Sequence, residues 1–267
     1  MNEFKINFQL QELDKIVPWG EEPHLSLNWF GLTDGLLWID AGSQTIYEYN
    51  EAANNYFGSS NRYNDYNISR FLEDFFDTFK YVGESIPEEI YNNLDEFDAK
   101  MEKWKACHID EEDAVFDQFY FDEYCELGEW NWNRSFDSAH LVGGPYIGCF
   151  RCGEKIKILW ESAFRLDDGN SIWTAPTGSL ELPYDAFVLS VTEFFDSFSA
   201  AMDRQVEKAV IKEWENVSID KQKLIKENDE RKSGFLKDIA FLTHPSENTD
   251  WSSVRRLYSK MESEIKL

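Results

Sequence analysis

The sequence has little positive charge. Lys and Arg total 26 residues against 51 Asp and Glu, which gives a formal net charge of −25 at pH 7. Direct binding to nucleic acid needs a basic surface that displaces phosphate counterions, and no segment supplies one. An anionic membrane surface is disfavoured for the same reason. The excess of negative charge instead favours a basic partner, because a field of one sign steers molecules of the opposite sign.

The chain also lacks a long hydrophobic run. No stretch of about 18 apolar residues is present, so we expect no transmembrane helix. The first residues, MNEFKINFQLQELDK, contain neither the basic nor the apolar segment of a secretory signal peptide. These absences predict a cytoplasmic protein.

Familiar catalytic motifs are absent as well. The histidines, His24, His108, His140 and His244, form no HExxH motif, and neither a GxSxG elbow nor a glycine-rich phosphate loop is present. The run from Asp110 to Asp113 lacks the glycine and the alternation of a calcium-binding EF-hand loop. Acidic residues are too numerous for the sequence to single out a catalytic pair. We therefore expect no cofactor, and whether the protein is an enzyme stays open.

Cysteine is scarce, and its four residues are Cys107, Cys125, Cys149 and Cys152. In a reducing compartment free thiols are more common than disulfides. The one CxxC lies at the end of an expected strand and has no second tight pair of ligands, which disfavours zinc. The sequence predicts ordinary thiols and no metal site.

The negative charge is concentrated in one segment. Between Asp65 and Glu129 there are 20 acidic and 5 basic residues, a local charge of −15. The chain also holds 21 Phe, 12 Tyr and 10 Trp, and this aromatic content excludes an intrinsically disordered acidic protein. The acidic residues are therefore expected to decorate a folded body.

Period-two alternation predicts strands in the N-terminal and central parts of the chain. A hairpin is expected around the turn at Ala41–Ser43, and Cys152–Glu154 and Asp167–Asn170 are expected to turn between later strands. The predicted strands are residues 4–10, 25–29, 36–39, 45–49, 140–142, 146–151, 155–160 and 172–174.

Helical spacing dominates the acidic segment and the C-terminal part. Ser69 is expected to cap one helix, and Ser85 to Glu88 fits the capping box of a second helix with an apolar stripe from Ile90 to Trp104. Further helices are predicted over about residues 110–126, 184–214 and 219–232, the last ending at Ser233–Gly234, and after Asp250.

These elements predict an α+β fold. An antiparallel sheet, built from the N-terminal and central strands, would pack against the helices of residues 69–127 and 184–214. We expect residues 1–216 to form one domain with an acidic helical insertion at about 65–129. Residues 217–267 are expected to form a helical extension packed on that domain.

Two tryptophans, Trp130 and Trp132, close the acidic segment. At positions i and i+2 of a strand they would share one face. Large aromatic residues favour a buried sheet face, and an anchor in an interface is the other interpretation.

Three stretches resemble a bacterial family of uncharacterised proteins. They are Pro18-Trp19-Gly20 with residues 25–35 (LSLNWFGLTDG), Arg134 and Asp137 with residues 140–147 (HLVGGPYI), and residues 172–176 (IWTAP) with the helix after Pro183. The resemblance covers roughly residues 1–210. It implies family membership, and no activity or catalytic residue carries over from it.

The acidic segment leads to a binding hypothesis. We interpret the chain as an immunity or antitoxin-like protein that neutralises a basic toxin, for example a nuclease, because an acidic helical surface speeds the encounter with a basic cleft and then covers it. The expected partner-binding residues are Glu88, Glu89, Asp95, Glu96, Asp98, Asp110 and Asp113, with Trp130 or Trp132 as anchors.

An enzyme is the alternative. It would be a hydrolase that uses carboxylates in a cleft between the sheet and the helices, with Asp34, Arg134, Asp137 and His140 as its site. A deep pocket lined by these side chains would favour this alternative, and a filled core around them would count against it. A structural or regulatory adaptor with the same acidic surface is the third hypothesis.

Overall fold

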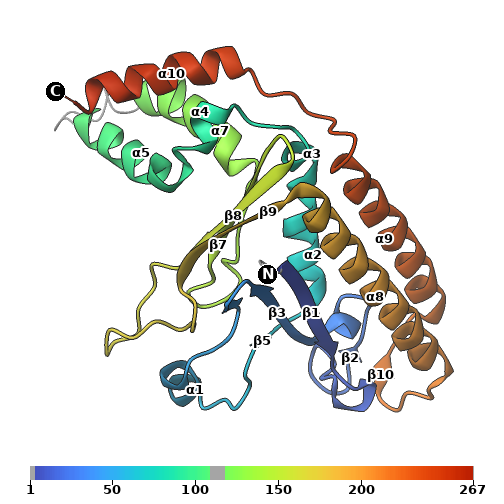
Figure 1. Cartoon of the computed structure of the whole chain (residues 1–267). Helices are drawn as coiled ribbons and strands as arrows, with labels where there is room; N and C mark the ends of the chain where they lie inside the picture. Colours follow the sequence, from blue (N-terminus) through green and yellow to red (C-terminus); the bar gives the residue numbers. More distant parts are fainter. Residues whose placement is uncertain (1–3, 109–117, 267) are drawn as a thin grey trace.

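Two antiparallel sheets form the centre of the molecule (Figure 1). The structure is a computed structural model that describes residues 4–108 and 118–266. In the N-terminal sheet, β3 (Gly35–Ala41) pairs with β1 (Phe4–Leu10), β4 (Gln44–Ile46) and β5 (Asn64–Asp65). The central sheet is a meander in the order β6 (Ser135–Asp137), β7 (Tyr146–Cys152), β8 (Lys155–Glu161) and β9 (Thr177–Pro183). A short parallel pair joins β2 (Leu25–Ser26) to β10 (Val217–Ser218). With the helices that cover these sheets, the fold is α+β, as predicted.

The strand predictions are confirmed where alternation is strongest. In β1 the side chains of Phe4 and Ile6 are buried and that of Lys5 is exposed. The β3–β4 hairpin turns through Gly42, whose φ of +64° lies in the left-handed region that favours glycine.

Four predicted strands are wrong in extent or in kind. Residues 45–49 supply only the end of β4, because the backbone turns at Tyr47, whose φ is +67°. In residues 25–29 only Leu25 and Ser26 form a strand, β2, and the 3₁₀ helix η2 (Gly31–Thr33) follows soon after. Residues 140–142 form turns, in which the Leu141 amide donates to the Ser138 carbonyl at 2.8 Å. Residues 172–174 make a single bridge, from Trp173 to Tyr49. Local turn hydrogen bonds satisfy the backbone there without a longer ladder.

One hydrophobic core, called the main core here, lies between the two sheets and the helices α2 (Ile68–Asp77), α3 (Phe79–Val82), α8 (Tyr184–Ile211) and α9 (Lys221–Phe241). Helix α8 packs along β1, where the rings of Phe194 and Phe198 lie 5.8 and 5.5 Å from that of Phe8. The small elements η1 (Leu13–Lys15) and α1 (Glu51–Phe57) connect the strands of the N-terminal half.

Two helix boundaries around the main core differ from the prediction. Helix α2 begins at Ile68, so Ser69 is not a cap, and its buried hydroxyl lies 2.9 Å from that of Thr33. Helix α9 continues through Ser233 and Gly234. A glycine inside a helix costs about 1 kcal/mol, and the packing of α9 against α8, α2 and α3, with Phe235 buried, outweighs that cost.

A second core, called the outer core here, lies on the other side of the central sheet. It is built by α4 (Glu88–Tyr91), α5 (Leu94–His108), the π-helix η3 (Tyr120–Tyr124), α7 (Cys125–Trp132) and α10 (Trp251–Glu264). The predicted apolar stripe is confirmed, because Ile90, Leu94, Phe97, Met101 and Trp104 are all buried in this core. Helix α10 begins after Asp250, as predicted, and the Asp250 side chain caps it.

Other expectations in the outer core are wrong. The single helix predicted after Ser85 is interrupted between α4 and α5. The Ser85 hydroxyl accepts a hydrogen bond from the Gly153 amide at 2.9 Å instead of capping α4. Trp130 and Trp132 lie on α7, not on a strand. Since helical residues two apart point in different directions, Trp130 is 2% exposed and Trp132 is 42% exposed.

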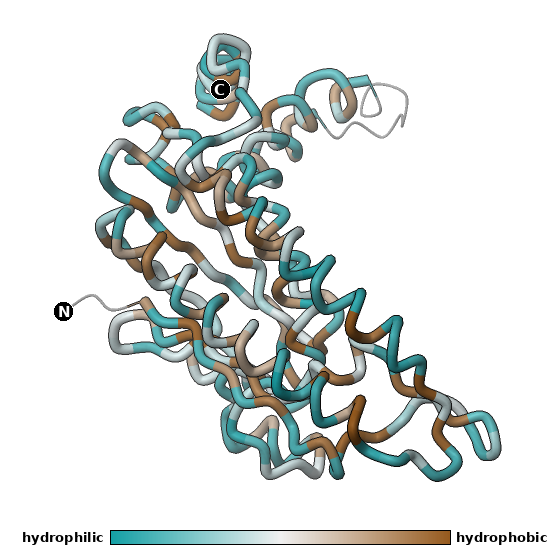
Figure 2. The backbone as a smooth tube through the Cα atoms, turned by 90° about the vertical axis from the view of Figure 1, so that its right-hand side faces the viewer, coloured by the Kyte–Doolittle hydropathy of each residue, from teal (hydrophilic) through white to brown (hydrophobic). Residues whose placement is uncertain are grey.

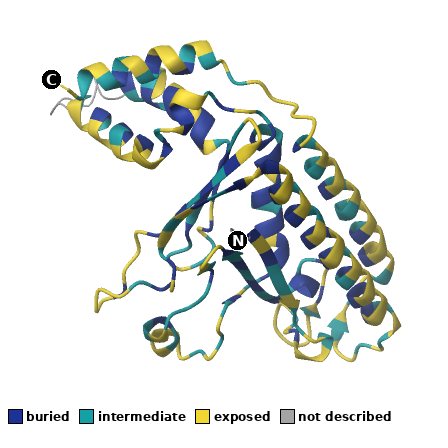
Figure 3. Ribbon diagram, in the orientation of Figure 1, coloured by how far each residue is buried: buried dark blue, intermediate teal, exposed yellow. Residues whose placement is uncertain are grey.

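The central sheet therefore separates two cores. Ile156 and Ile158 of β8 point into the main core, whereas Phe150 and Leu159 belong to the outer core. Figure 3 shows buried residues concentrated on the sheets and on the helix sides next to them. In Figure 2 hydrophilic positions interrupt the hydrophobic ones along each helix, and no helix in the described part of the chain is long and apolar enough to cross a membrane.

Candidate functional site

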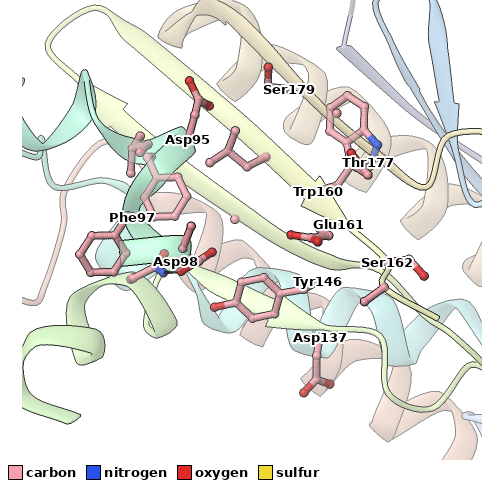
Figure 4. A pocket seen from close by; sticks show the side chains of 18 of the residues that line it. Asp95, Phe97, Asp98, Asp137, Tyr146, Trp160, Glu161, Ser162, Thr177 and Ser179 are labelled. Atoms are coloured by element: carbon pink, nitrogen blue, oxygen red, sulfur yellow. Dashed lines mark hydrogen bonds between the residues drawn. The ribbon is translucent and has the colours of Figure 1, made fainter. Parts of the chain in front are cut away.

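A pocket of about 700 Å³ lies between the outer face of the central sheet and helix α5 (Figure 4). The sheet supplies side chains from all four strands, because every second residue of a strand points to the same face. Helix α5 forms one wall, and the loop that follows β8 forms part of the rim. The polar and aromatic residues that line the pocket include Asp95, Phe97, Asp98, Asn131, Asp137, Tyr146, Phe150, Glu161, Ser162, Phe164, Thr177 and Ser179.

The ionisable lining of the pocket is acidic. Its carboxylates belong to Asp95, Asp98, Asp137 and Glu161, and Lys, Arg and His do not occur among the lining residues. Asp95 is neutralised by Lys157 of β8 at 3.2 Å. Within the described residues the other three carboxylates form no ion pair. Three negative charges without a counterion therefore surround one cavity.

Asp98 is held in place by a neutral neighbour. The Asn131 amide on α7 donates to its Oδ1 at 2.9 Å. Burial by the pocket walls raises the pKa of Asp98, and the negative charge of Glu161 raises it further. A carboxyl in such a place binds a proton, or a positive charge, more readily than an ordinary surface aspartate.

Tyr146 of β7 lies between these acids (Figure 4). Burial raises the pKa of Tyr146 to about 12, with smaller contributions from Asp98 and Asp137. Its hydroxyl lies near Ser135, which opposes this rise in pKa, yet no hydrogen bond of ordinary geometry to a described residue satisfies it. The hydroxyl oxygen itself is buried.

Aromatic rings provide the apolar part of the wall. Phe97 and Phe150 are each 2% exposed, whereas Phe164 is 43% exposed and lies at the rim. The rim is fixed by the Gly143 carbonyl, which accepts from the Ser162 hydroxyl at 2.7 Å and from the Trp173 indole at 2.6 Å. The sequence motif of residues 140–147 thus shapes one edge of the pocket.

The sequence model of a family of unknown function (DUF5984) matches residues 5–257. The chain belongs to the DUF5984 family. The match reaches beyond the roughly 210 residues of the resemblance found in the sequence and includes α9 and half of α10. No curated protein and no solved structure matches the chain.

Helix α10 supplies cations to the acidic helices of this DUF5984 protein. Arg255 pairs with Glu89 at 2.6 Å, Lys260 with Glu123 at 2.5 Å, and Arg256 with Glu126 at 3.7 Å. The hydrogen bond from Arg255 lowers the pKa of Glu89. Part of the acidic charge that the sequence assigns to a partner is therefore neutralised inside the molecule.

The predicted partner-binding residues fall into separate groups. Glu89 and Glu96 pair with Arg255 and Lys100, Asp95 pairs with Lys157, and Glu88 is exposed without an ion pair among the described residues. Asp98 lines the pocket, Trp130 is buried in the outer core and Trp132 is exposed beside it. Asp110 and Asp113 lie outside the described residues.

Arg134, from the alternative site, is fully buried in a clasp that anchors the segment before α10. Its guanidinium donates to the Glu84 carboxylate, to the Trp130 carbonyl at 2.8 Å and to the Thr249 hydroxyl at 3.1 Å. Burial lowers the pKa of Arg134 to about 10, although Glu84 opposes this shift. Glu84 also accepts from the Trp251 indole at 2.9 Å. This is a filled core, with no room for a substrate.

The other residues of the alternative site lie apart from this clasp. Asp137 alone of the four lines the pocket. His140 packs 4.9 Å from the ring of Tyr66, and burial lowers its pKa. Asp34 stands at the start of β3, where burial raises its pKa. The structure does not bring the four into one site.

The cysteines form no disulfide in the structure. All four cysteines are free, and burial raises the pKa of Cys149 to about 12. Within the described residues no cluster of His, Cys, Asp or Glu has the arrangement of a metal site.

Sequence reasoning missed Tyr146, Glu161 and Asn131 as site residues. The alternation of β8 places Glu161 on the same face as Lys157 and Leu159. The sequence of residues 155–161 shows this alternation, so the face of Glu161 could have been predicted. The position of α5 over this face could not have been predicted, because α5 and β8 are more than forty residues apart in the chain.

Proposed function

We propose that this protein binds and neutralises a basic toxin, such as a nuclease, in the manner of an immunity or antitoxin protein. The observation that carries the proposal is the set of unpaired carboxylates of Asp98, Asp137 and Glu161 around one pocket. The net charge of −25 adds a long-range attraction for a basic partner. A group of unpaired acids on α5 and the central sheet gives that attraction a place to act.

The proposed contact surface is centred on the pocket and extends to Glu88. The acids that α10 already neutralises contribute less, because an exposed ion pair screens their charge. The unpaired acids, and not those paired with α10, should therefore control the rate of association with the partner.

Charge reversal tests the proposal. In the pocket variant, Glu88, Asp98, Asp137 and Glu161 are replaced by Lys; in the matched control, Glu51, Glu207, Glu213 and Glu215 are replaced, all exposed residues with the same charge change. A basic protein captured from the native host at low salt should associate with the pocket variant about tenfold more slowly than with wild type. The control should lose much less, and wild-type protein should inhibit the activity of the captured partner.

Two results would contradict the proposal. Equal slowing by both variants would show that net charge alone matters, and an uninhibited partner would exclude neutralisation. High salt should release the partner in every case in which charge drives the encounter.

A carboxylate-dependent hydrolase is the second candidate. The observation in its favour is that Asp98, whose pKa is raised, shares the pocket with Glu161. One acid with a raised pKa and one ionised partner is the arrangement that glycoside hydrolysis uses. Turnover of a simple glycoside that disappears in Asp98→Asn would support this candidate over the binding role.

A further inference from the structure

We propose that the pocket between the central sheet and α5 binds an alkylammonium group, that is, a charged amine carried on an aliphatic chain. The inference rests on the proposed function for one source of this group, a lysine side chain of the basic partner. A free polyamine has the same chemistry and is the other source.

The charge of the pocket calls for a cation. Among the residues that the structure describes, Asp98 and Asp137 accept hydrogen bonds only from neutral groups, the Asn131 amide at 2.9 Å and the Ala139 backbone at 3.1 Å. Glu161 has no hydrogen bond or ion pair to a described residue. Like charges gathered in a partly desolvated space repel one another, and a bound cation removes that repulsion.

The walls suit the rest of an alkylammonium ligand. Phe97, Tyr146, Phe150 and Phe164 line the cavity, and the face of an aromatic ring attracts a cation. Leu94 and Leu159 add apolar surface against which methylene groups can pack. The same chain already places a lysine ammonium over a tyrosine, since Lys157 Nζ lies 5.3 Å from the ring centre of Tyr91 on the neighbouring part of this face.

The acceptors that the pocket offers to a bound amine are its carboxylates. The hydroxyl oxygen of Tyr146 is itself buried, so it is not counted among them. An ammonium group has N–H donors and no acceptor, so it matches a site of carboxylates. A neutral sugar could bond to the same oxygens, but it would leave the three negative charges uncompensated.

The volume agrees with a chain rather than a small ion. A cavity of about 700 Å³ is within the range of pockets that hold organic ligands. It can take a polyamine, or a lysine side chain together with its neighbouring residues. It is larger than a bare metal cation needs.

Calorimetric titration of the purified protein tests the inference. The probes are n-butylammonium and spermidine as free amines, a blocked peptide with a central lysine, the same peptide with that lysine acetylated, and glucose. We expect the amines or the lysine peptide to bind, and acetylation to abolish peptide binding. Glu161→Gln and Asp98→Asn should each weaken binding about tenfold, whereas the matched surface variant Glu207→Gln should leave it unchanged.

The outcomes separate the sources and can overturn the inference. Tight binding of spermidine without the lysine peptide supports a free polyamine, and the reverse supports a lysine of the partner. No binding by any amine, equal binding of the acetylated peptide, or binding of glucose that survives both pocket variants would each overturn it. Because this titration contains no toxin, its failure leaves the capture of a basic partner standing, and failure of the capture leaves amine binding standing.

Discussion

The two cores on either side of the central sheet are stabilised in different ways. In the main core, aromatic and aliphatic side chains from two sheets and long helices pack together, and Phe75, Phe79 and Phe187 are 1% exposed or less. In the outer core, short acidic helices pack on a stripe of apolar residues, and charged contacts with α10 surround that stripe. The first core depends on packing and the second depends also on ion pairs.

This difference explains how a segment of high negative charge folds. Like charges on α4, α5 and α7 repel one another, and burial of their apolar stripe alone would have to overcome that repulsion. Helix α10 contributes Val254, Leu257 and Met261 to the core and basic side chains to its edge. The acidic helices are thus completed by a part of the chain more than a hundred residues away.

The largest expected effect comes from truncation in the main core. Phe187→Ala should lower the free energy of unfolding by about 3–5 kcal/mol, because it leaves a cavity at a fully buried site. Leu257→Ala on α10 is the counterpart in the outer core. Chemical denaturation with amide hydrogen exchange should show loss of protection everywhere in the first variant and chiefly in α5, α7 and α10 in the second. If both variants lose amide protection in β1 and β3 equally, the two cores unfold as one cooperative unit.

A slightly smaller effect is expected from the clasp. Glu84→Ala leaves the guanidinium of Arg134 buried without its counterion, which should destabilise the outer core by about 3 kcal/mol. Limited proteolysis should then cut residues 243–250 sooner than in wild type. Glu84→Gln keeps part of the hydrogen bonding to Thr249 and Trp251. Its rate of proteolysis should therefore lie between those of wild type and Glu84→Ala. Unchanged proteolysis in Glu84→Ala would show that the clasp does not hold the segment before α10.

The smallest effect is a dependence on pH. The hydrogen bond from Lys100, at 2.6 Å, lowers the pKa of Glu262. A carboxyl with a lowered pKa in the folded state adds stability above its unfolded pKa of about 4.3, and this stability is lost as the pH falls through the folded value. Acidification below about pH 4.3 should therefore remove about 0.5 kcal/mol from the α10 contact, given its partial exposure. Glu262→Gln should abolish that part of the pH dependence in the exchange of α10 amides, and an unchanged profile would contradict it.

Local patterns made much of the fold predictable. Alternation located β1, β7 and β8, and helical spacing located α8, α10 and the stripe of α5. Predictions failed where long-range packing decides. Gly234 stays helical because α9 packs on α8, and Trp130 is helical because α7 fills the outer core.

The candidate site was only partly predictable for the same reason. Asp95, Asp98 and Asp137 were recognised as possible functional residues, although for two different functions, and the structure places all three in one pocket. Glu161 and Tyr146 join them through strand pairing and through the crossing of α5 over the sheet. Arg134 shows the reverse case, since a residue in a specific motif proves to be buried in an ion pair.

The late position of α10 in the chain has a consequence for synthesis on the ribosome. Helices α5 and α7 leave the ribosome long before residues 251–264, so their apolar stripe must wait for the helix that covers it. During that interval the acidic residues give the waiting segment a strong negative charge, which keeps nascent chains apart. We therefore expect the acidic segment to oppose aggregation until α10 has covered it.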